Sequence, residues 1–153
     1  MLPSVKNKRA EHALPVMPCA CGSVRRAARA TTQLYDRALR PSGLNTAQFT
    51  LLQTLEQAGP LTQGRLGDVL ALDSTTLSRT LRPLEARRWV RSERGEDRRE
   101  RSISLTMPGR AQLERARPAW ERAQRRLKSR LGAERWDDLL RELATLAGVA
   151  REA

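Results

Sequence analysis

The sequence predicts a mainly α-helical protein with a small antiparallel β-wing, arranged as a winged helix-turn-helix. Three observations lead to this prediction. Apolar residues recur at spacings of three and four along several segments, which is typical of amphipathic helices. Two of the shorter segments are separated by a link of about one turn, and a pattern typical of a hairpin follows the second. The chain of 153 residues is long enough for one such domain with helical extensions.

The charge of the chain indicates a polyanionic partner. Lys and Arg number 29 against 17 Asp and Glu, which gives a formal net charge of +12 at pH 7. Such an excess attracts nucleic acid in a salt-dependent manner. Aromatic residues are limited to three Trp, one Tyr and one Phe, which leaves few platforms for stacking unpaired bases. Composition by itself therefore indicates an anion-binding protein.

The sequence gives no sign of a membrane or export signal. Nowhere do 18 apolar residues run together, so no membrane partner is expected. The first residues lack the apolar core of a signal peptide, and we expect a cytoplasmic protein. Its two cysteines are too few for a disulfide framework and should be reduced thiols in that compartment.

Residues 1–18 are predicted to form a flexible basic N-terminal arm, because they lack periodicity and contain three prolines. A plain disordered tail is the alternative. Residues 19–45 are predicted to contain a dimerisation helix. Small and apolar residues repeat at helical spacing from Ala20 to Arg40, and Pro41 with the residues after it should end the helix.

Residues 46–106 are predicted to form the DNA-binding domain. Asn45, followed three residues later by Gln48, resembles a capping box that opens a helix. A short helix should follow Thr62, and the link at residues 71–73 should lead into the next helix. The residues expected to be buried on the two helices before this link are Phe49, Leu52, Leu55, Leu66, Val69 and Leu70.

The helix that begins at Ser74 is predicted to enter the major groove of DNA. Leu77, Leu81 and Leu84 share one face of it, as core-facing residues should. The opposite side is polar, and helix-turn-helix proteins read base edges with such a face. An ordinary solvated face is the alternative, although such a face usually favours Glu and Lys. The candidate DNA-contacting residues on this helix are Ser74, Thr75, Thr76, Ser78, Arg79 and Arg82.

The pattern after Trp89 predicts a charged hairpin, the wing. Residues 90–92 and 102–105 alternate like strands, and residues 95–97 supply turn chemistry between them. An acidic residue beside Arg99 can hold its guanidinium in a pose suited to a narrow minor groove. An ordinary solvated turn with mutually screened charges is the alternative. The candidate wing contacts are Asp97, Arg98 and Arg99.

Residues 107–153 are predicted to form two long dimerisation helices. Apolar residues recur at near-heptad spacing from Leu113 to Leu131, and a second stripe begins at Trp136. A two-fold dimer formed by these helices and the N-terminal helix lets two recognition helices read a pseudo-palindrome. Packing within one chain only is the alternative. Pro118 is expected to bend the first of the two helices.

The chain resembles MarR-type winged helix-turn-helix regulators over residues 19–150, in motifs that follow the family's order: LNTAQFTLLQTL, LTQGRLGDVLALDSTTLSRTLRPLEARRWV and EDRRERSISLT. The resemblance implies a homodimer that binds an operator through a recognition helix from Ser74 to Arg88. It also places Asp97 and Arg99 at the Asp-x-Arg motif of the family's wing. The family often binds small aromatic acids between its dimerisation helices and its DNA-reading part.

Two positions depart from the family pattern. Arg88 stands where the family typically has a glycine after the recognition helix, and a non-glycine residue in a left-handed cap costs about 1 kcal/mol. Pro83 lies within the recognition helix and removes a backbone hydrogen-bond donor. We therefore expect some distortion in the last turn of this helix.

Cys21 lies near the start of the first helix, which resembles the organic-hydroperoxide-sensing branch of the family. That resemblance implies a redox sensor at Cys21, with Tyr35 fourteen residues further along the helix. Cys19 does not fit the pattern of that branch, but it could act as a resolving thiol or join Cys21 in binding a soft metal ion. The branch also has a second tyrosine at the start of the next helix, where this chain has Thr46. Inert packed thiols are the alternative. Two thiols alone make an incomplete metal site, so no metal ion is expected.

The leading functional hypothesis is a sequence-specific, dimeric transcriptional regulator, most simply a repressor. It would leave a pseudo-palindromic operator on double-stranded DNA in response to a small aromatic molecule or an oxidant. A non-regulatory basic structural or RNA-binding protein is the alternative. An enzyme is disfavoured, because the sequence has no catalytic triad, phosphate-cradling loop or metal cluster, and no catalytic residue or cofactor is expected.

Overall fold

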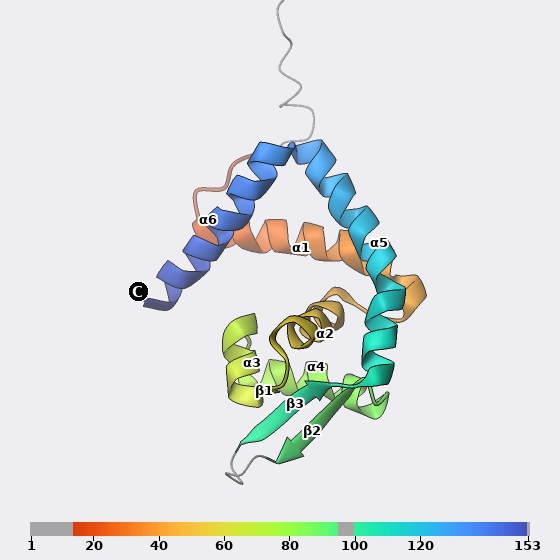
Figure 1. Cartoon of the computed structure of the whole chain (residues 1–153). Coiled ribbons are helices and arrows are strands. Elements are labelled where there is room, and N and C mark those ends of the chain that lie inside the picture. Colours follow the sequence, from red (N-terminus) through yellow and green to blue (C-terminus); the bar gives the residue numbers. More distant parts are fainter. Residues whose placement is uncertain (1–13, 95–99, 153) are drawn as a thin grey trace, which may run out of the picture. The chain divides into compact units, whose positions relative to one another are not determined.

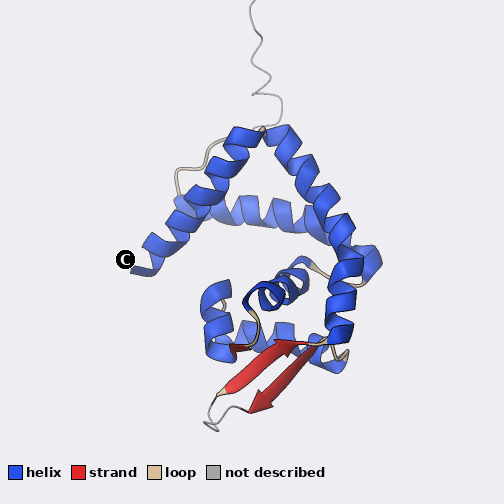
Figure 2. Cartoon of the chain, in the orientation of Figure 1, coloured by secondary structure: helices blue, strands red, loops and turns tan. Residues whose placement is uncertain are grey.

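The computed structural model describes residues 14–94 and 100–152, which are predominantly helical (Figure 1 and Figure 2). This part confirms a mainly α-helical fold with a small antiparallel sheet. The chain divides within its first helix, after Gln33, and the two parts are described separately. In chain order the elements are α1 (Ala20–Leu39), the 3-10 helix η1 (Arg40–Ser42), α2 (Thr46–Ala58), β1 (Leu61–Thr62), α3 (Gln63–Leu70), α4 (Ser74–Ala86), β2 (Val90–Arg94), β3 (Arg101–Leu105), α5 (Met107–Leu131) and α6 (Ala133–Glu152).

The N-terminal part consists of a short lead-in and most of α1. The Cys19 carbonyl accepts the N–H of Ser23 at 3.0 Å and so belongs to the first helical turn. The guanidinium of Arg26 donates to the Pro15 carbonyl at 2.7 Å, which holds the lead-in against the helix. The helix predicted to begin at Ala20 does begin there.

The second part starts with the end of α1 and its connection to α2. Gly43 adopts a left-handed conformation with φ 73° and closes η1. The predicted capping box is present: the Gln48 N–H donates to the Asn45 side chain at 2.9 Å, and the Asn45 N–H donates to the Gln48 side chain at 3.2 Å. These bonds satisfy backbone donors that α2 leaves unpaired at its start. The predicted core residues Phe49, Leu52 and Leu55 are buried.

The helix-turn-helix consists of α3 and α4, joined by residues 71–73 as predicted. The expectation that Val69 is buried is wrong, because this side chain is 52% exposed. A Cβ at Gly67 would lie only 3.1 Å from the Leu72 carbonyl oxygen. The side of α3 that carries Gly67 therefore packs against the turn. The buried face of α3 is thus centred on Leu66 and Gly67, about 100° apart, and the helical period turns Val69 to solvent.

Three strands form an antiparallel sheet in the order β1–β3–β2. The ladder between β2 and β3 runs from Val90 opposite Leu105 to Arg94 opposite Arg101, so the described part of the predicted wing is a regular hairpin. The sequence does not predict β1, because two residues are too few for an alternating pattern. The candidate wing contacts Asp97, Arg98 and Arg99 lie outside the described residues.

A single hydrophobic core connects α2, α4, the sheet and the first half of α5. The three leucines predicted for the inner face of α4 are all buried. Phe49 stacks on Trp120 of α5 with ring centroids 5.5 Å apart. Gln112 is 5% exposed, and its amide donates to the Ser42 carbonyl, which satisfies a polar group that the core surrounds.

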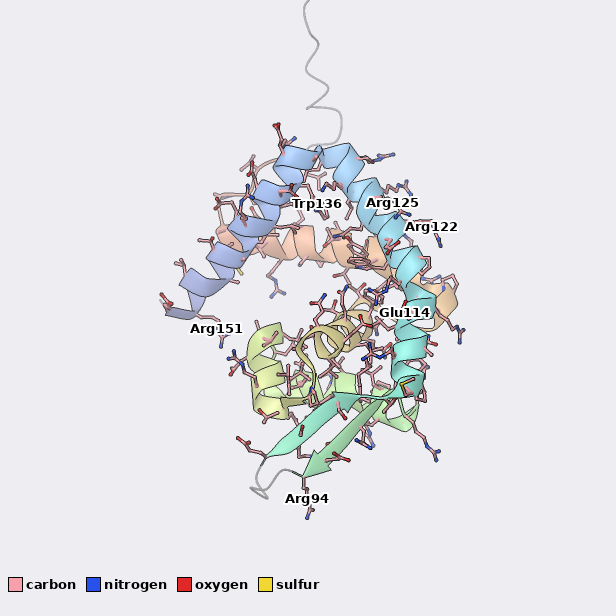
Figure 3. The ribbon with its side chains drawn as sticks, in the orientation of Figure 1. Arg94, Glu114, Arg122, Arg125, Trp136 and Arg151 are labelled. Atoms are coloured by element: carbon pink, nitrogen blue, oxygen red, sulfur yellow. The ribbon has the colours of Figure 1, made fainter. Side chains whose placement is uncertain are left out.

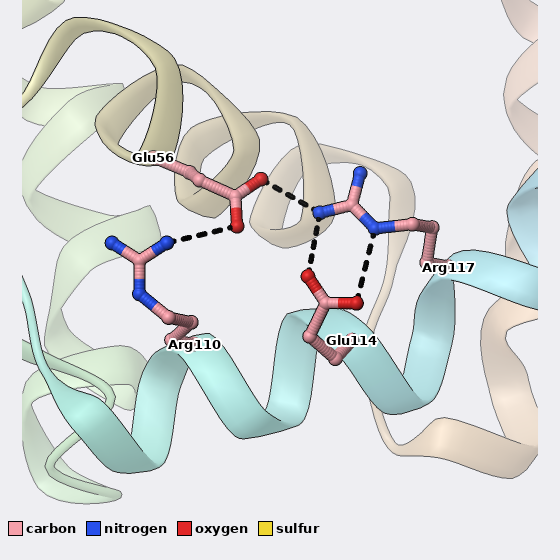
Figure 4. A network of polar contacts seen from close by, with 4 residues as sticks. All are labelled: Glu56, Arg110, Glu114 and Arg117. Carbon is pink, nitrogen blue, oxygen red and sulfur yellow. Dashed lines mark hydrogen bonds and ion pairs between the residues drawn. The ribbon is translucent and has the colours of Figure 1, made fainter.

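An arginine and glutamate network fixes α2 against α5 (Figure 4). Glu56 of α2 accepts from Arg110 at 3.2 Å and from Arg117 at 2.7 Å, both on α5. Arg117 also pairs with Glu114 at 3.0 Å. Hydrogen bonds to Glu114 and to Glu56 raise the pKa of Arg117 above its ordinary value. The network thus holds the orientation of α5 on α2 through charges that are partly shielded from water.

The recognition helix α4 ends two residues before the predicted Arg88, because its last turn closes in a left-handed cap. Arg88 has φ 57°. The Trp89 N–H donates to the Leu84 carbonyl and the Arg88 N–H to the Glu85 carbonyl, both at 2.9 Å, which is the Schellman pattern. The expected left-handed arginine is therefore confirmed, at a cost of about 1 kcal/mol. Pro83 lies inside the helix without ending it.

Thr106 joins the end of the recognition helix to the start of α5. Its hydroxyl donates to the Arg88 carbonyl at 2.6 Å and accepts the Gly109 N–H at 3.0 Å. Its N–H donates to the Trp89 carbonyl at 3.1 Å. A Cβ at Gly109 would lie 1.9 Å from the Trp89 carbonyl oxygen, so this close approach of two backbones requires glycine.

The two C-terminal helices differ in how far a single chain covers them. Leu113, Ala116 and Ala123 of α5 are buried, and Figure 1 shows α5 changing direction along its length, as expected for a helix that contains Pro118. On α6 only Trp136 is buried. The large apolar residues that α6 exposes, each by 41% to 59%, are Leu139, Leu140, Leu143, Leu146 and Val149.

The end of α6 reaches the helix-turn-helix. Arg151 pairs with the Asp68 carboxylate of α3 at 3.3 Å and donates to the Asp68 carbonyl at 2.9 Å. Both side chains are more than half exposed. Among the described helices, none is long and apolar enough to cross a membrane.

We predict that Gly109→Ala destabilises the protein by on the order of 2 kcal/mol, because the new methyl group overlaps the Trp89 carbonyl. Urea denaturation followed by circular dichroism measures the free energy of unfolding. Gly64→Ala on α3 is the matched control, since nothing lies within 4 Å of its Cβ position, and it should leave this free energy unchanged or slightly higher. Equal values for the two variants would contradict the close approach at Gly109.

Candidate nucleic-acid interface

The start of the recognition helix is fixed by Asp73. Its carboxylate accepts the Thr76 N–H at 2.9 Å and the Thr76 hydroxyl at 2.6 Å. The hydrogen bonds from the Thr76 hydroxyl and then from its N–H lower the pKa of Asp73 below its ordinary value. Thr76 was predicted as a DNA contact, and the structure places its hydroxyl in the helix cap.

The other predicted residues of this helix form one exposed face, which we call the recognition face. The recognition face comprises Ser74, Thr75, Ser78, Arg79 and Arg82. These five residues line a shallow groove of about 360 Å³. Among the described residues, neither Arg79 nor Arg82 has a carboxylate or carbonyl partner for its guanidinium. Two arginines are therefore available to an outside ligand, on a helix held rigidly from behind by buried leucines.

Gln63 is a further polar residue beside the recognition face, and the sequence pattern did not predict it. It is the first residue of α3, and its amide donates to the Ser78 hydroxyl at 3.1 Å. Thr62 immediately before it caps α3 by accepting the Arg65 N–H at 3.2 Å. A second groove of about 520 Å³, between the starts of α3 and α4 and the end of the sheet, includes Gln63. The position of Gln63 next to a predicted N-cap was the only sequence signal that could have indicated it.

The described part of the wing carries three arginines, and two of them form ion pairs. Arg91 pairs with Glu93 at 3.0 Å, and Arg101 pairs with Glu85 of α4 at 3.8 Å. Figure 3 shows Arg94 at the end of β2, pointing away from the sheet. The described hairpin thus has arginines on its surface, and Arg91 and Arg101 pair with neighbouring carboxylates.

The residues of the predicted redox sensor lie in different surroundings. Cys19 and Cys21 are both exposed free thiols in the N-terminal part. The Tyr35 hydroxyl donates to the Gln124 side chain of α5, and burial raises the pKa of Tyr35. Thr46 donates through its N–H and its hydroxyl to Asp36, at 2.7 Å and 2.6 Å. No group of three or more metal-ligating side chains occurs among the residues that the structure describes.

A groove between the end of α1 and the middle of α5 gathers further unpaired arginines. Its volume is about 400 Å³, and its lining combines leucine and alanine side chains with arginines. For Arg37, Arg122 and Arg126, the structure gives no ion pair with any described residue. A groove that combines cationic and apolar side chains fits a small amphiphilic anion. The lining residues are Leu34, Arg37, Ala38, Ala119, Arg122, Ala123 and Arg126.

Comparisons with curated proteins find relatives over part of the chain. Residues 44–100 match the model of the MarR family. The uncharacterized HTH-type transcriptional regulator YwoH of Bacillus subtilis is 34% identical over 83 residues, which cover 54% of this chain and 61% of YwoH. An uncharacterized HTH-type regulator of Bacillus cereus is 36% identical over 88 residues, which cover 58% of each chain. The matched segments thus span about three fifths of these relatives.

Solved structures match nearly the whole chain. The M. tuberculosis transcriptional regulator MosR in complex with DNA is 38% identical with a TM-score of 0.80, over 88% of this chain and 97% of MosR. A mutant of E. coli MarR complexed with operator DNA has a TM-score of 0.73 over 82% of this chain and 91% of MarR. At 24% identity, the second likeness supports the fold alone.

Proposed function

Because the chain belongs to the MarR family of transcriptional regulators, we propose that it binds an operator on double-stranded DNA and controls transcription from it, most simply as a repressor in the cytoplasm. A basic structural or RNA-binding protein is not favoured, because the relatives are described as transcriptional regulators and MosR is described in complex with DNA. None of these relatives is described as an enzyme.

The observation that carries this proposal is the recognition face on α4. It presents three hydroxyl residues, together with two arginines that have no ion-pair partner among the described residues, on a helix whose other side is buried. A helix of this width fits the major groove, where arginine can donate two hydrogen bonds to guanine. Arg79 and Arg82 are the residues we assign to base or phosphate contacts, and Ser74, Thr75 and Ser78 to shorter polar contacts.

The wing is proposed to contact the adjacent minor groove through Arg98 and Arg99, with Asp97 orienting Arg99. This assignment rests on the family's Asp-x-Arg motif. The regular pairing of β2 with β3 up to Arg94 and Arg101 supports it, because a DNA-contacting wing is built on such a pair of strands.

A homodimer is proposed to form through α1, α5 and α6. The exposed apolar residues of α6 recur at helical spacing and would be covered by a second copy of the chain. Burying leucine side chains of this kind removes apolar surface from water, which favours association. The two recognition helices of such a dimer should lie about 34 to 36 Å apart and read a pseudo-palindromic operator.

Release from the operator is proposed to follow one of two signals. The first is oxidation: Cys19 and Cys21 lose two protons and two electrons to an organic hydroperoxide, which becomes an alcohol and water, and a disulfide forms. Side chains two residues apart on a helix point about 200° apart, so this disulfide requires the first turn of α1 to open. The second signal is a small aromatic acid in the groove that contains Arg37, Arg122 and Arg126.

We predict that the reduced protein binds the DNA upstream of its own gene more tightly than scrambled duplex in a fluorescence anisotropy titration. Arg79→Ala or Arg82→Ala should cost about 1 to 3 kcal/mol on the preferred site if either reads guanine. Arg99→Ala should weaken binding and give a shallower salt dependence. Arg125→Ala on α5, which removes an arginine paired with Glu121 at 3.5 Å, is the control and should bind normally. Tighter binding to single-stranded RNA than to duplex DNA would sink the proposal.

We predict that Leu143→Asp shifts the protein from dimer to monomer in sedimentation velocity, because a carboxylate cannot be buried cheaply in an apolar interface. Operator binding should weaken with it. Val69→Asp is the matched control, since Val69 is an exposed apolar residue on α3, 52% exposed against 41% for Leu143, and it should remain dimeric. A Leu143→Asp variant that sediments as wild type would remove α6 from the interface.

We predict that one equivalent of cumene hydroperoxide releases the wild-type protein from DNA, that dithiothreitol restores binding, and that Cys21→Ser stays bound throughout. If the wild type also stays bound, millimolar benzoate should release it, and Arg122→Ala should respond less than the Arg125→Ala control. Persistent binding under both treatments would refute both proposed signals.

A further inference from the structure

Arg88 has a strained backbone conformation and a side chain without an ion-pair partner among the described residues. Its φ of 57° lies in the left-handed region that favours glycine, and glycine could make the same two cap hydrogen bonds without strain. The guanidinium of Arg88 has no carboxylate or carbonyl partner among the residues that the structure describes. Strained residues persist where something else favours them, and function is a common reason.

The neighbouring Arg87 shows what a structural arginine does at the same helix end. Its guanidinium lies 4.8 Å from the ring centroid of Trp89 and donates to the Gly43 carbonyl at 2.9 Å. Arg87 therefore ties the end of α4 to the loop before α2. Arg88 makes no comparable side-chain contact with the described fold, so its side chain is not explained by stability.

The Arg88 side chain lines a groove between the end of α4 and the base of the β2–β3 hairpin. The groove has a volume of about 430 Å³. Its lining residues are Glu85, Arg88, Val90, Arg91, Ser92, Arg101 and Thr106. Three arginines thus stand against one glutamate, and of the three only Arg88 lacks a carboxylate partner among the described residues.

A buried hydroxyl belongs to one of the residues that line the same groove. The Ser92 hydroxyl is buried and has no hydrogen-bond partner in the described part of the chain. Buried polar atoms are nearly always satisfied, and an exception calls for a missing partner. The Ser92 hydroxyl is closed to solvent, so the capacity of the groove to bind an anion depends on Arg88, the one lining arginine without a carboxylate partner among the described residues.

We propose that Arg88 binds a phosphate of the DNA backbone. This inference rests on the proposed function, in which α4 occupies the major groove and the hairpin the adjacent minor groove. The phosphodiester strand that separates the two grooves must then pass between these elements, where the groove that contains Arg88 lies. Arginine suits this place because its planar guanidinium can donate two hydrogen bonds to one phosphate. The contact is independent of base sequence and sets the register of α4 on the duplex.

The test is Arg88→Gly. Relief of backbone strain should make this variant more stable, whereas loss of the positive charge should weaken its binding to DNA. Without DNA, the variant should melt at a higher temperature than wild type, because the left-handed cap is no longer strained. In anisotropy titrations its affinity should fall by on the order of tenfold, equally on the upstream site and on scrambled duplex. The slope of log K against log salt should become shallower by about 0.9 for each Arg88 removed, hence by about twice that for a dimer.

Two matched variants separate the lost cation from the relaxed backbone. Arg88→Lys keeps the charge in the same conformation and should keep most of the affinity and the salt slope. Ala71→Gly relieves the other non-glycine residue with positive φ in the described chain, at 51°, without changing any charge. It should raise the melting temperature and leave DNA binding unchanged. Equal loss of binding in Ala71→Gly would attribute the effect to backbone flexibility and overturn the phosphate contact.

The remaining outcomes distinguish this inference from the proposed function. If wild type prefers its upstream site and Arg88→Gly binds with the same affinity and salt slope, only the role of Arg88 is overturned. If wild type does not bind duplex DNA, both proposals fall. Sodium phosphate and sodium chloride at equal ionic strength should give wild type the same melting temperature. A phosphate-dependent rise that Arg88→Gly abolishes would assign the groove to a free anion and overturn the contact with the DNA backbone.

Discussion

The approach of α5 to the carbonyl of Trp89 is the contact on which the DNA-reading geometry depends. It is possible only because residue 109 is a glycine, and Thr106 secures it with hydrogen bonds to both sides of the junction. The end of the recognition helix, the last residue of β3 and the first turn of α5 meet at this point. Since all three positions are fixed together, the recognition face, the hairpin and the long helix cannot shift independently.

Arginine serves two separate purposes in this chain, and ion pairing distinguishes them. Arg110 and Arg117 are held by Glu56 and stabilise the packing of α2 on α5. Arg79 and Arg82 are left without described partners on the outer side of α4, where burial of the opposite face keeps them in place. A high net charge therefore does not spread evenly over the surface. Arginines that join helices are paired with glutamate, whereas those on the outer side of α4 have no described partner and can bind an anionic ligand.

Local signals in the sequence were sufficient for most of the fold. Asn45 with Gln48 predicted the start of α2, and the leucine spacing of α4 predicted its buried face, because both follow from hydrogen-bonding and periodicity within one helix. Features set by contacts between elements were not predictable. Val69 is exposed because Gly67 brings α3 close to the turn, β1 is too short to show a pattern, and Gln63 is significant only through its contact with Ser78. Five of the six residues predicted for the outer side of α4 form its exposed face, and the sixth, Thr76, hydrogen-bonds to Asp73 in the helix cap.

The pairing of Arg151 with Asp68 has a consequence for operator architecture. A pair this exposed contributes about 0 to 1 kcal/mol, so thermal motion breaks and remakes it readily. The contact between α6 and α3 is thus weak, whereas the junction at Gly109 is fixed by the close approach of two backbones. In the proposed dimer each half therefore tilts slightly at little cost, which favours tolerance of operators whose half-sites differ by a base pair in separation.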